Sequence, residues 1–129
     1  MGRPQVMVVE DEPEMLEIVQ VNLEQAGYGV IPARDGVEAY EALEAADPDA
    51  MVLDLNLPNM SGFRLLRLLR RDARWKDLPL IVVTAFAFDE VEEIANEGID
   101  GFLTKPFHPA DLISRLEYVL ARSRRAGTR

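Results

Sequence analysis

The sequence predicts an α/β protein, with a doubly wound parallel sheet that carries helices on both faces. Short apolar runs alternate with longer amphipathic stretches five times along the 129 residues. This alternation favours parallel strands, because each strand–helix–strand crossover is right-handed. The third apolar run, Ala50–Leu53, contains no polar residue, as expected for a strand buried on both faces. A chain of this length fits one domain.

Each expected strand leads into an expected helix. The first helix starts at Pro13 and ends at Gly27, because glycine suits the left-handed residue that follows a helix. In the third helix, after Gly62, the leucine spacing predicts a buried face and leaves the arginines outside. The strands are expected at Gln5–Val9, Gly29–Ala33, Ala50–Leu53, Leu80–Thr84 and Gly101–Thr104. The other helices are expected to open at Asp35, to span Asp89–Glu97 and to begin at Ala110. The helix after Gly62 is expected to place Leu65, Leu66 and Leu69 inward and Arg64, Arg67, Arg70 and Arg71 outward.

The composition excludes several classes of function. The formal net charge is −9, so the surface repels a phosphate backbone and we expect no direct binding of nucleic acid. Cysteine is absent, which excludes disulfides and thiolate metal sites and agrees with a reducing cytoplasm. No apolar stretch approaches the roughly 20 residues that span a bilayer. We therefore expect a cytoplasmic protein that does not enter a membrane.

The chain divides into one domain and a short basic tail. We expect the domain at residues 5–121 and the tail at residues 122–129, which hold four arginines. Cations favour the carbonyl end of a helix, so the tail is either the solvated end of the last helix or the start of a linker.

Polar side chains stand at the ends of four expected strands. They are Glu10 with Asp11, then Asp54, then Thr84, then Lys105 after Thr104. Each alone has an ordinary explanation, such as a helix cap for Asp54 or a solvated loop position for Lys105. The carboxyl ends of parallel strands meet at one edge of a sheet, however, and ligands bind there. The sequence therefore predicts one shared site.

This combination of groups suits a divalent cation and a phosphoryl group. Clustered carboxylates repel one another and favour a bound cation, and Mg²⁺ takes one or two carboxylates, keeps some water ligands and leaves room for phosphate oxygens. The ammonium of Lys105 and the hydroxyl of Thr84 suit a phosphoryl oxygen. A carboxylate such as Asp54 can itself form an acyl phosphate.

The segments that carry these residues resemble the receiver domain of two-component response regulators. The resemblance extends from Gln5 to Ala121 and implies a flavodoxin-like fold with the strands in the spatial order 2-1-3-4-5. The matching segments are Val6–Pro13, Met51–Gly62, Val82–Ala85 and Leu103–Phe107.

The resemblance implies a role for each residue of the site. Asp54 would accept a phosphoryl group from a sensor histidine kinase or a histidine phosphotransfer protein. The protein would then catalyse only its own phosphorylation and dephosphorylation, and would not be an enzyme acting on other molecules. Metal binding would fall to Asp11, Asp54, the backbone carbonyl of Asn56 and, through water, Glu10. Thr84 and Lys105 would contact the phosphoryl group, and Thr84 would form a switch with Phe102. The phosphorylation lifetime would be controlled by Asn56 and Phe86.

Some positions depart from the family pattern. Ser61 replaces an aspartate before Gly62, and both residues are good helix caps. The chain is one residue shorter between Thr84 and Lys105, which affects the Asp89–Glu97 helix and therefore the α4-β5-α5 output surface that the family implies. The Lys105–Pro106 peptide is expected to be cis, as in the family.

The output and two rival functions stay open. The output protein or domain is unknown, and a phosphorylation-dependent homodimer is one option, for which Asp100 and Arg115 offer a charge pair. One rival is a receiver-like interaction module that is never phosphorylated. The other is a magnesium-dependent phosphatase with an aspartate nucleophile, although such enzymes commonly carry an acid where this chain has Asn56.

Overall fold

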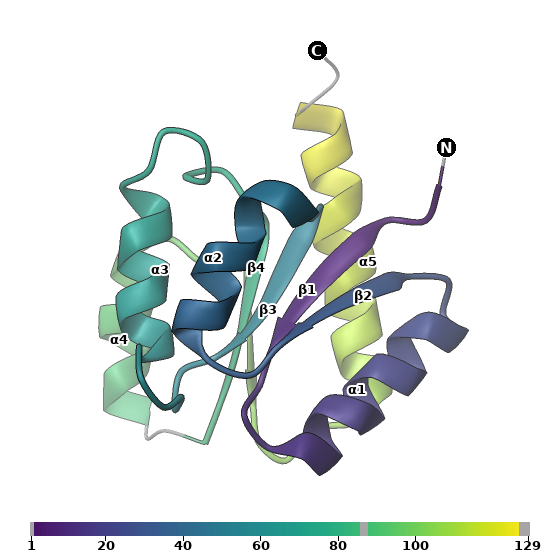
Figure 1. Ribbon diagram of the computed structural model, residues 1–129, viewed down its shortest axis with the longest axis horizontal. Helices are drawn as coiled ribbons and strands as arrows, with labels where there is room; N and C mark the ends of the chain where they lie inside the picture. Colours follow the sequence, from purple (N-terminus) through teal and green to yellow (C-terminus); the bar gives the residue numbers. More distant parts are fainter. Residues whose placement is uncertain (1, 86–87, 127–129) are drawn as a thin grey trace.

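Five strands alternate with five helices in the computed structural model, which describes residues 2–85 and 88–126 (Figure 1). The strands are β1 (Gln5–Val9), β2 (Gly29–Ala33), β3 (Ala50–Asp54), β4 (Leu80–Thr84) and β5 (Gly101–Thr104). The helices are α1 (Pro13–Gln25), α2 (Gly36–Ala46), α3 (Gly62–Arg70), α4 (Phe88–Asn96) and α5 (Pro109–Ala126).

All five strands form one parallel sheet in the order β2-β1-β3-β4-β5, which confirms the predicted fold. From β1 the chain adds β2 on one side, and then β3, β4 and β5 on the other side. A topological switch point therefore lies between the carboxyl ends of β1 and β3. The edge strand β2 contains Pro32, opposite Val8 of β1. Proline has no N–H to donate, and an edge strand tolerates this because only one side is paired.

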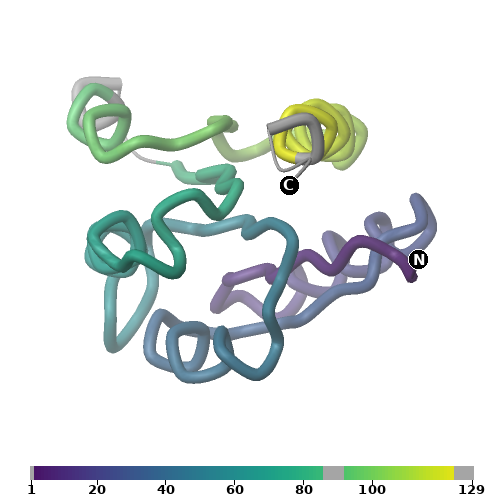
Figure 2. The backbone as a smooth tube through the Cα atoms, turned by 90° about the horizontal axis from the view of Figure 1, so that it is seen from above, coloured from purple at the N-terminus to yellow at the C-terminus, as the bar shows by residue number. Residues whose placement is uncertain are grey.

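Alternate side chains of the strands pack into two hydrophobic clusters, one on each face of the sheet. The helices α1 and α5 cover one face, whereas α2, α3 and α4 cover the other; in Figure 2, α5 lies apart from α2 and α3 with strands between them. The first cluster includes Val8, Val52, Val83, Leu16, Leu23, Leu112 and Leu116. The second includes Met7, Leu53, Val82, Leu43, Leu65, Leu66, Leu69 and Ile94.

The helix faces agree with the sequence pattern except at one position. The three leucines predicted to face inward from α3 are fully buried. Arg70 was expected to point outward, and this expectation is wrong, because its side chain is only 11% exposed. The helix α5 continues to Ala126, so residues 122–126 of the basic tail are helical. Among the described residues, no helix is both long enough and apolar enough to span a bilayer.

Candidate functional site

The predicted residues meet at the carboxyl ends of β1, β3 and β5, around a cavity of about 410 Å³. Asp54 is the last residue of β3, while Glu10 and Lys105 directly follow β1 and β5. The backbone N–H of Glu10 donates to Ala33 (2.9 Å) and that of Lys105 to Thr84 (2.9 Å), so both still lie on the hydrogen-bonding ladder of the sheet. The cavity is lined by Glu10, Asp11, Glu12, Pro13, Asp54, Asn56, Ala85 and Lys105.

Lys105 bridges two buried carboxylates. Its Nζ lies 2.8 Å from Glu10 Oε1 and 2.8 Å from Asp54 Oδ2. The side chains of Glu10 and Asp54 are 6% and 5% exposed, and that of Lys105 is 19% exposed. Ion pairs hidden from water to this extent are strongly coupled, and removing one partner leaves a buried charge without compensation.

The second oxygen of each carboxylate is held by a backbone N–H. Asn56 donates to Asp54 Oδ1 at 3.0 Å, and Glu12 donates to Glu10 Oε2 at 3.1 Å. Both donors stand two residues after the carboxylate that they bind. The orientation of Asp54 is therefore set by Asn56 on one oxygen and by Lys105 on the other.

Burial and pairing shift the pKa values of two of these groups. Burial raises the pKa of the Glu10 carboxyl, and the hydrogen bonds from Lys105 and from the N–H of Glu12 offset only part of this effect. Burial alone would lower the pKa of Lys105. Its hydrogen bonds and charge interactions with Asp54 and Glu10 outweigh the burial, and the pKa of Lys105 is raised. The ammonium form is thus the stable one in this site.

Asp11 completes a set of carboxylates that fits a divalent cation. One oxygen each of Glu10, Asp11 and Asp54 lies within 4.8 Å of the others. Oxygens on opposite sides of an octahedral Mg²⁺ are about 4.2 Å apart, so only a small movement is needed to bring these oxygens around one ion. Three carboxylates face one ammonium, which leaves two negative charges uncompensated and favours a doubly charged cation. The exposed position of Asp11 gives such an ion access from solvent.

Several local backbone features lie next to Asp54 and Lys105. The Lys105–Pro106 peptide is cis, as expected. Ser61 caps α3 by accepting a hydrogen bond from the N–H of Arg64 at 3.2 Å, which confirms its predicted role as a helix cap. Gly62, the first residue of α3, packs directly on the backbone of Asp54 and Leu55, and its N–H donates to the Leu55 carbonyl at 3.1 Å.

The predicted switch residues lie on β4 and β5, and neither is among the residues that line the cavity. Thr84 is fully buried at the end of β4, one residue before Ala85, which lines the cavity. Phe102 is partly buried and packs on the cluster under α3 and α4, opposite Val82 in the β4–β5 register. Phe86, predicted to influence the phosphorylation lifetime, lies outside the described residues.

The sequence interpretation assigned no role to some residues of the site. Glu12 and Pro13 line the cavity, and the run of acids from Glu10 to Glu12 was the available signal for Glu12. The link between Asp35 and Asn59 was also missed, since its residues are 24 positions apart and neither belongs to the strand-end pattern.

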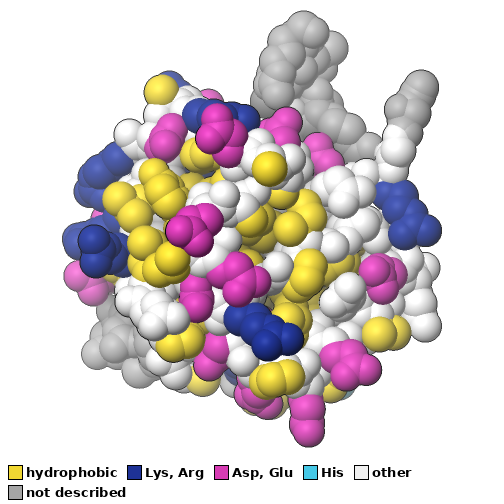
Figure 3. Space-filling model, viewed as in Figure 1, with side chains coloured by type: hydrophobic (Ala, Val, Ile, Leu, Met, Phe, Trp, Pro, Cys, Tyr) yellow, Lys and Arg dark blue, Asp and Glu magenta, His cyan; other side chains and the backbone are white. Residues whose placement is uncertain are grey.

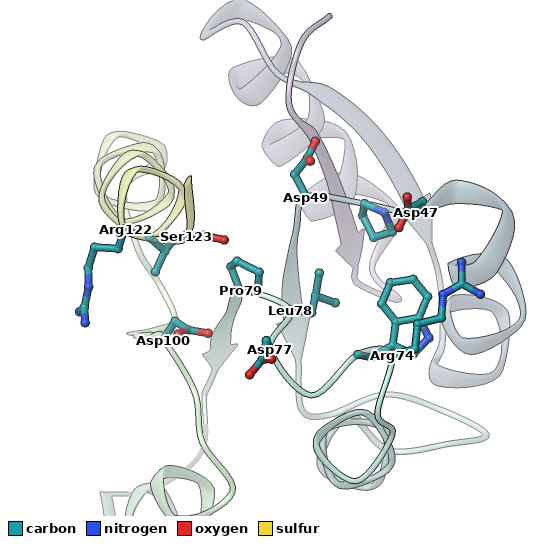
Figure 4. A pocket seen from close by; sticks show the side chains of 12 residues that line it. Asp47, Asp49, Arg74, Asp77, Leu78, Pro79, Asp100, Arg122 and Ser123 are labelled. Atoms are coloured by element: carbon teal, nitrogen blue, oxygen red, sulfur yellow. The ribbon is translucent and has the colours of Figure 1, made fainter. Parts of the chain in front are cut away.

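A larger depression, of about 720 Å³, lies at the opposite end of the sheet (Figure 4). It is formed where β3, β4 and β5 begin, by Asp49, Pro79 and Asp100 among others, with Arg122 and Ser123 of α5. Asp100, which was considered for a charge pair with Arg115, here contacts Arg70 at 3.3 Å and accepts from the N–H of Leu80 at 2.8 Å. The predicted strand-end residues lie at the other edge, so size does not indicate the site.

Comparisons with known proteins agree with the fold. The family model described as "Response regulator receiver domain" matches residues 6–117. The chemotaxis protein CheY1 of Helicobacter pylori is 37% identical over 118 residues, which cover 89% of this chain and 95% of that protein. A CheY-like receiver domain structure from Methanospirillum hungatei has a TM-score of 0.90 at 26% identity and covers 98% of this chain and 100% of its own.

Longer relatives carry more than this domain. The DNA-binding dual master transcriptional regulator RpaA of Synechocystis is 36% identical over 124 residues, which are 95% of this chain but only 51% of that protein. The chain therefore spans about half the length of such curated relatives. Because the family model covers most of the chain and CheY1 matches over nearly its whole length, the chain belongs to the receiver domains of two-component response regulators.

Proposed function

We propose that this receiver domain is a phosphorylation switch in which Asp54 accepts a phosphoryl group in a magnesium-dependent reaction. The donor is a sensor histidine kinase or a histidine phosphotransfer protein. The observation that carries the proposal is the position of Asp54: it is buried at the edge of the sheet, bonded to Lys105, and close to the carboxylates of Glu10 and Asp11.

The chemistry follows from the groups around Asp54. A carboxylate oxygen of Asp54 attacks phosphorus, the P–N bond to the donor imidazole breaks, and the imidazole takes up a proton. Phosphoryl transfer depends mainly on positioning and on neutralising charge. Asn56 fixes one oxygen of Asp54, and the ammonium of Lys105 lies beside the other, where negative charge develops. Mg²⁺, held by Asp11, Asp54 and the backbone carbonyl of Asn56, with Glu10 acting through water, would neutralise charge on the phosphoryl oxygens.

The residue type at position 56 favours self-modification over turnover of other substrates. The residue two positions after Asp54 is Asn56, not the acid that commonly serves this class of phosphatase. Asp54 therefore keeps the phosphoryl group until water removes it, and Asn56 and Phe86 influence how quickly this happens. The domain in this proposal is not an enzyme for other molecules.

The output passes through the surface of α4, β5 and α5. On phosphorylation Thr84 moves toward the phosphoryl group and Phe102 turns into the space that it leaves, which is a two-state change biased by local charge. Phe102 lies on β5 against the cluster beneath α4, so its rotation is coupled to that surface. An output protein or domain, or a second copy of the chain, reads the change.

Labelling with acetyl phosphate tests the proposal. Intact-mass spectrometry should show one added phosphoryl group when Mg²⁺ is present. The added mass should be absent when Mg²⁺ is chelated before acetyl phosphate is added. Asp54→Asn should abolish labelling, whereas the matched surface variant Asp111→Asn should label like the wild type. Labelling that persists in Asp54→Asn would overturn the assignment, and sustained turnover of a phosphomonoester would instead support the phosphatase.

A further inference from the structure

The loop between β3 and α3, residues 55–61, needs an anchor if it is to hold Asp54 in place. It follows Asp54 directly and carries Asn56, whose N–H sets the orientation of the Asp54 carboxylate. Asn56, Pro58, Asn59 and Ser61 are exposed, whereas Leu57 and Met60 are partly buried against the core, so burial holds only some positions of the loop. Within the loop, the 3.1 Å hydrogen bond from Gly62 to Leu55 closes its base but leaves its tip to other contacts.

The tip of the loop is bonded to the start of α2. The side-chain amide of Asn59 donates to Asp35 Oδ2 at 2.8 Å. The other oxygen of the same carboxylate, Oδ1, accepts from the N–H of Glu38 at 2.7 Å and caps α2. These hydrogen bonds, with that from Glu38 the larger influence, hold the pKa of Asp35 below its usual value. One carboxylate thus serves both the helix and the loop.

The backbone of the tip fits the same attachment. Asn59 has φ of 65°, a left-handed conformation that asparagine adopts more readily than most residues. Next to it, Met60 packs against Gly36 so closely that a β-carbon on Gly36 would lie 2.9 Å from the Met60 β-carbon. The loop is therefore in contact with the start of α2 through both a side chain and the backbone.

We propose that Asp35 is a positioning residue for the phosphoacceptor, acting through Asn59 to hold the 55–61 loop. A helix cap needs only one acceptor oxygen, which Ser or Asn supplies as well as Asp. The second oxygen of Asp35 accepts the hydrogen bond from Asn59 in the loop. The same loop places Asn56 next to Asp54 and the cation site. The link to Mg²⁺ binding and phosphorylation rests on the proposed function, whereas the link to loop order does not.

Variants at the two positions separate the cap from the attachment. Asp35→Ser keeps a capping oxygen. The serine side chain is too short to reach Asn59, and it has no second oxygen to accept the Asn59 hydrogen bond. Asn59→Asp places two carboxylates face to face, and adding Asp35→Asn restores a donor and an acceptor with their directions reversed. Aspartate tolerates the left-handed conformation at position 59.

Three measurements on the full chain decide the proposal: Mg²⁺ affinity by titration calorimetry, the labelling rate with acetyl phosphate, and hydrogen exchange of residues 55–62 without Mg²⁺. We expect Asp35→Ser and Asn59→Asp each to weaken Mg²⁺ binding about fivefold and to speed loop exchange, with the melting temperature of Asp35→Ser nearly unchanged. The double variant Asp35→Asn/Asn59→Asp should return to within about twofold of the wild type.

The outcomes distinguish this inference from the proposed function. Unchanged loop exchange in Asp35→Ser, or no recovery in the double variant, would overturn the positioning role even if Asp54 is phosphorylated normally. If the wild type binds no Mg²⁺ and is not labelled at Asp54, the proposed function fails, and loop exchange alone then supports or refutes the attachment.

Discussion

A single arginine of α3 joins the two loops that lead into β4 and β5. The guanidinium of Arg70 donates to the carbonyls of Gly98 at 2.5 Å and of Leu78 at 2.9 Å, and it pairs with Asp100 at 3.3 Å. It also donates to the carbonyls of Trp75 and Lys76. Only a planar fork with several N–H groups can satisfy so many acceptors at once.

Replacing Arg70 with lysine should therefore be costly. A lysine ammonium cannot reach both loops, so Asp100 and the partly buried carbonyls of Trp75 and Leu78 would lose donors, and we expect the free energy of unfolding to fall by about 1–3 kcal/mol. Arg71→Lys is the matched control, because Arg71 is 65% exposed and its pair with Glu97 spans 3.5 Å; its expected loss is below about 0.5 kcal/mol. Urea unfolding measures both variants, and equal losses would contradict the role assigned to Arg70.

At the scale of elements, the sequence predicted the buried face of a helix and the meeting of the strand ends, because burial and sheet topology control these features. The leucine spacing of α3 predicted its buried face because helical periodicity places those side chains together. The meeting of Glu10, Asp54 and Lys105 was predictable as well, because the carboxyl ends of parallel strands share one edge whatever their loops do.

Contacts that depend on the path of a loop were not predictable. Arg70 binds the carbonyl of Gly98, 28 positions away, and any residue type at position 98 would offer that carbonyl. The bond between Asn59 and Asp35 depends likewise on a left-handed residue at the tip of the loop, which sequence spacing does not reveal. Arg70 therefore resembled an ordinary surface arginine in the sequence.

The start of α3 offers a test of how closely this helix must approach β3. A β-carbon on Gly62 would lie 2.6 Å from the Leu55 α-carbon and would overlap the Asp54 carbonyl oxygen. Gly62→Ala should therefore push α3 away from Asp54, the proposed phosphoacceptor, lower the free energy of unfolding by about 2 kcal/mol, and slow labelling of Asp54. Gly2→Ala is the control, since a β-carbon there meets nothing within 4 Å. A Gly62→Ala protein as stable and as readily labelled as the control would refute the close approach.

Across the whole molecule, negative charge is left uncompensated at the site. The chain carries a net charge of −9. Figure 3 shows Lys and Arg side chains gathered at the left edge of this face, where α3 lies in Figure 1. There Arg67 and Arg71 pair with Glu97, away from the carboxylates around Asp54. Among the described residues, Lys105 is the cation paired with those carboxylates, so the folded protein gains stability from any cation bound beside it.

Magnesium should therefore raise the melting temperature of the whole domain. At a concentration 100 times its dissociation constant, an ion that binds only the folded state adds about 2.7 kcal/mol, and each kcal/mol raises the melting temperature of a domain of this size by about 4 °C. Asp11→Asn should melt like the wild type or slightly higher without metal, because it relieves repulsion among carboxylates that lie within 4.8 Å of one another. The free energy of stabilisation that Mg²⁺ adds to Asp11→Asn should be smaller than in the wild type by at least about 1.4 kcal/mol, which corresponds to a tenfold loss of Mg²⁺ affinity. Thermal unfolding by circular dichroism, with potassium chloride at matched ionic strength, measures the difference. An equal gain in the two proteins, or an equal gain from potassium, would show that the ion acts by general screening and that Asp11 is not a ligand.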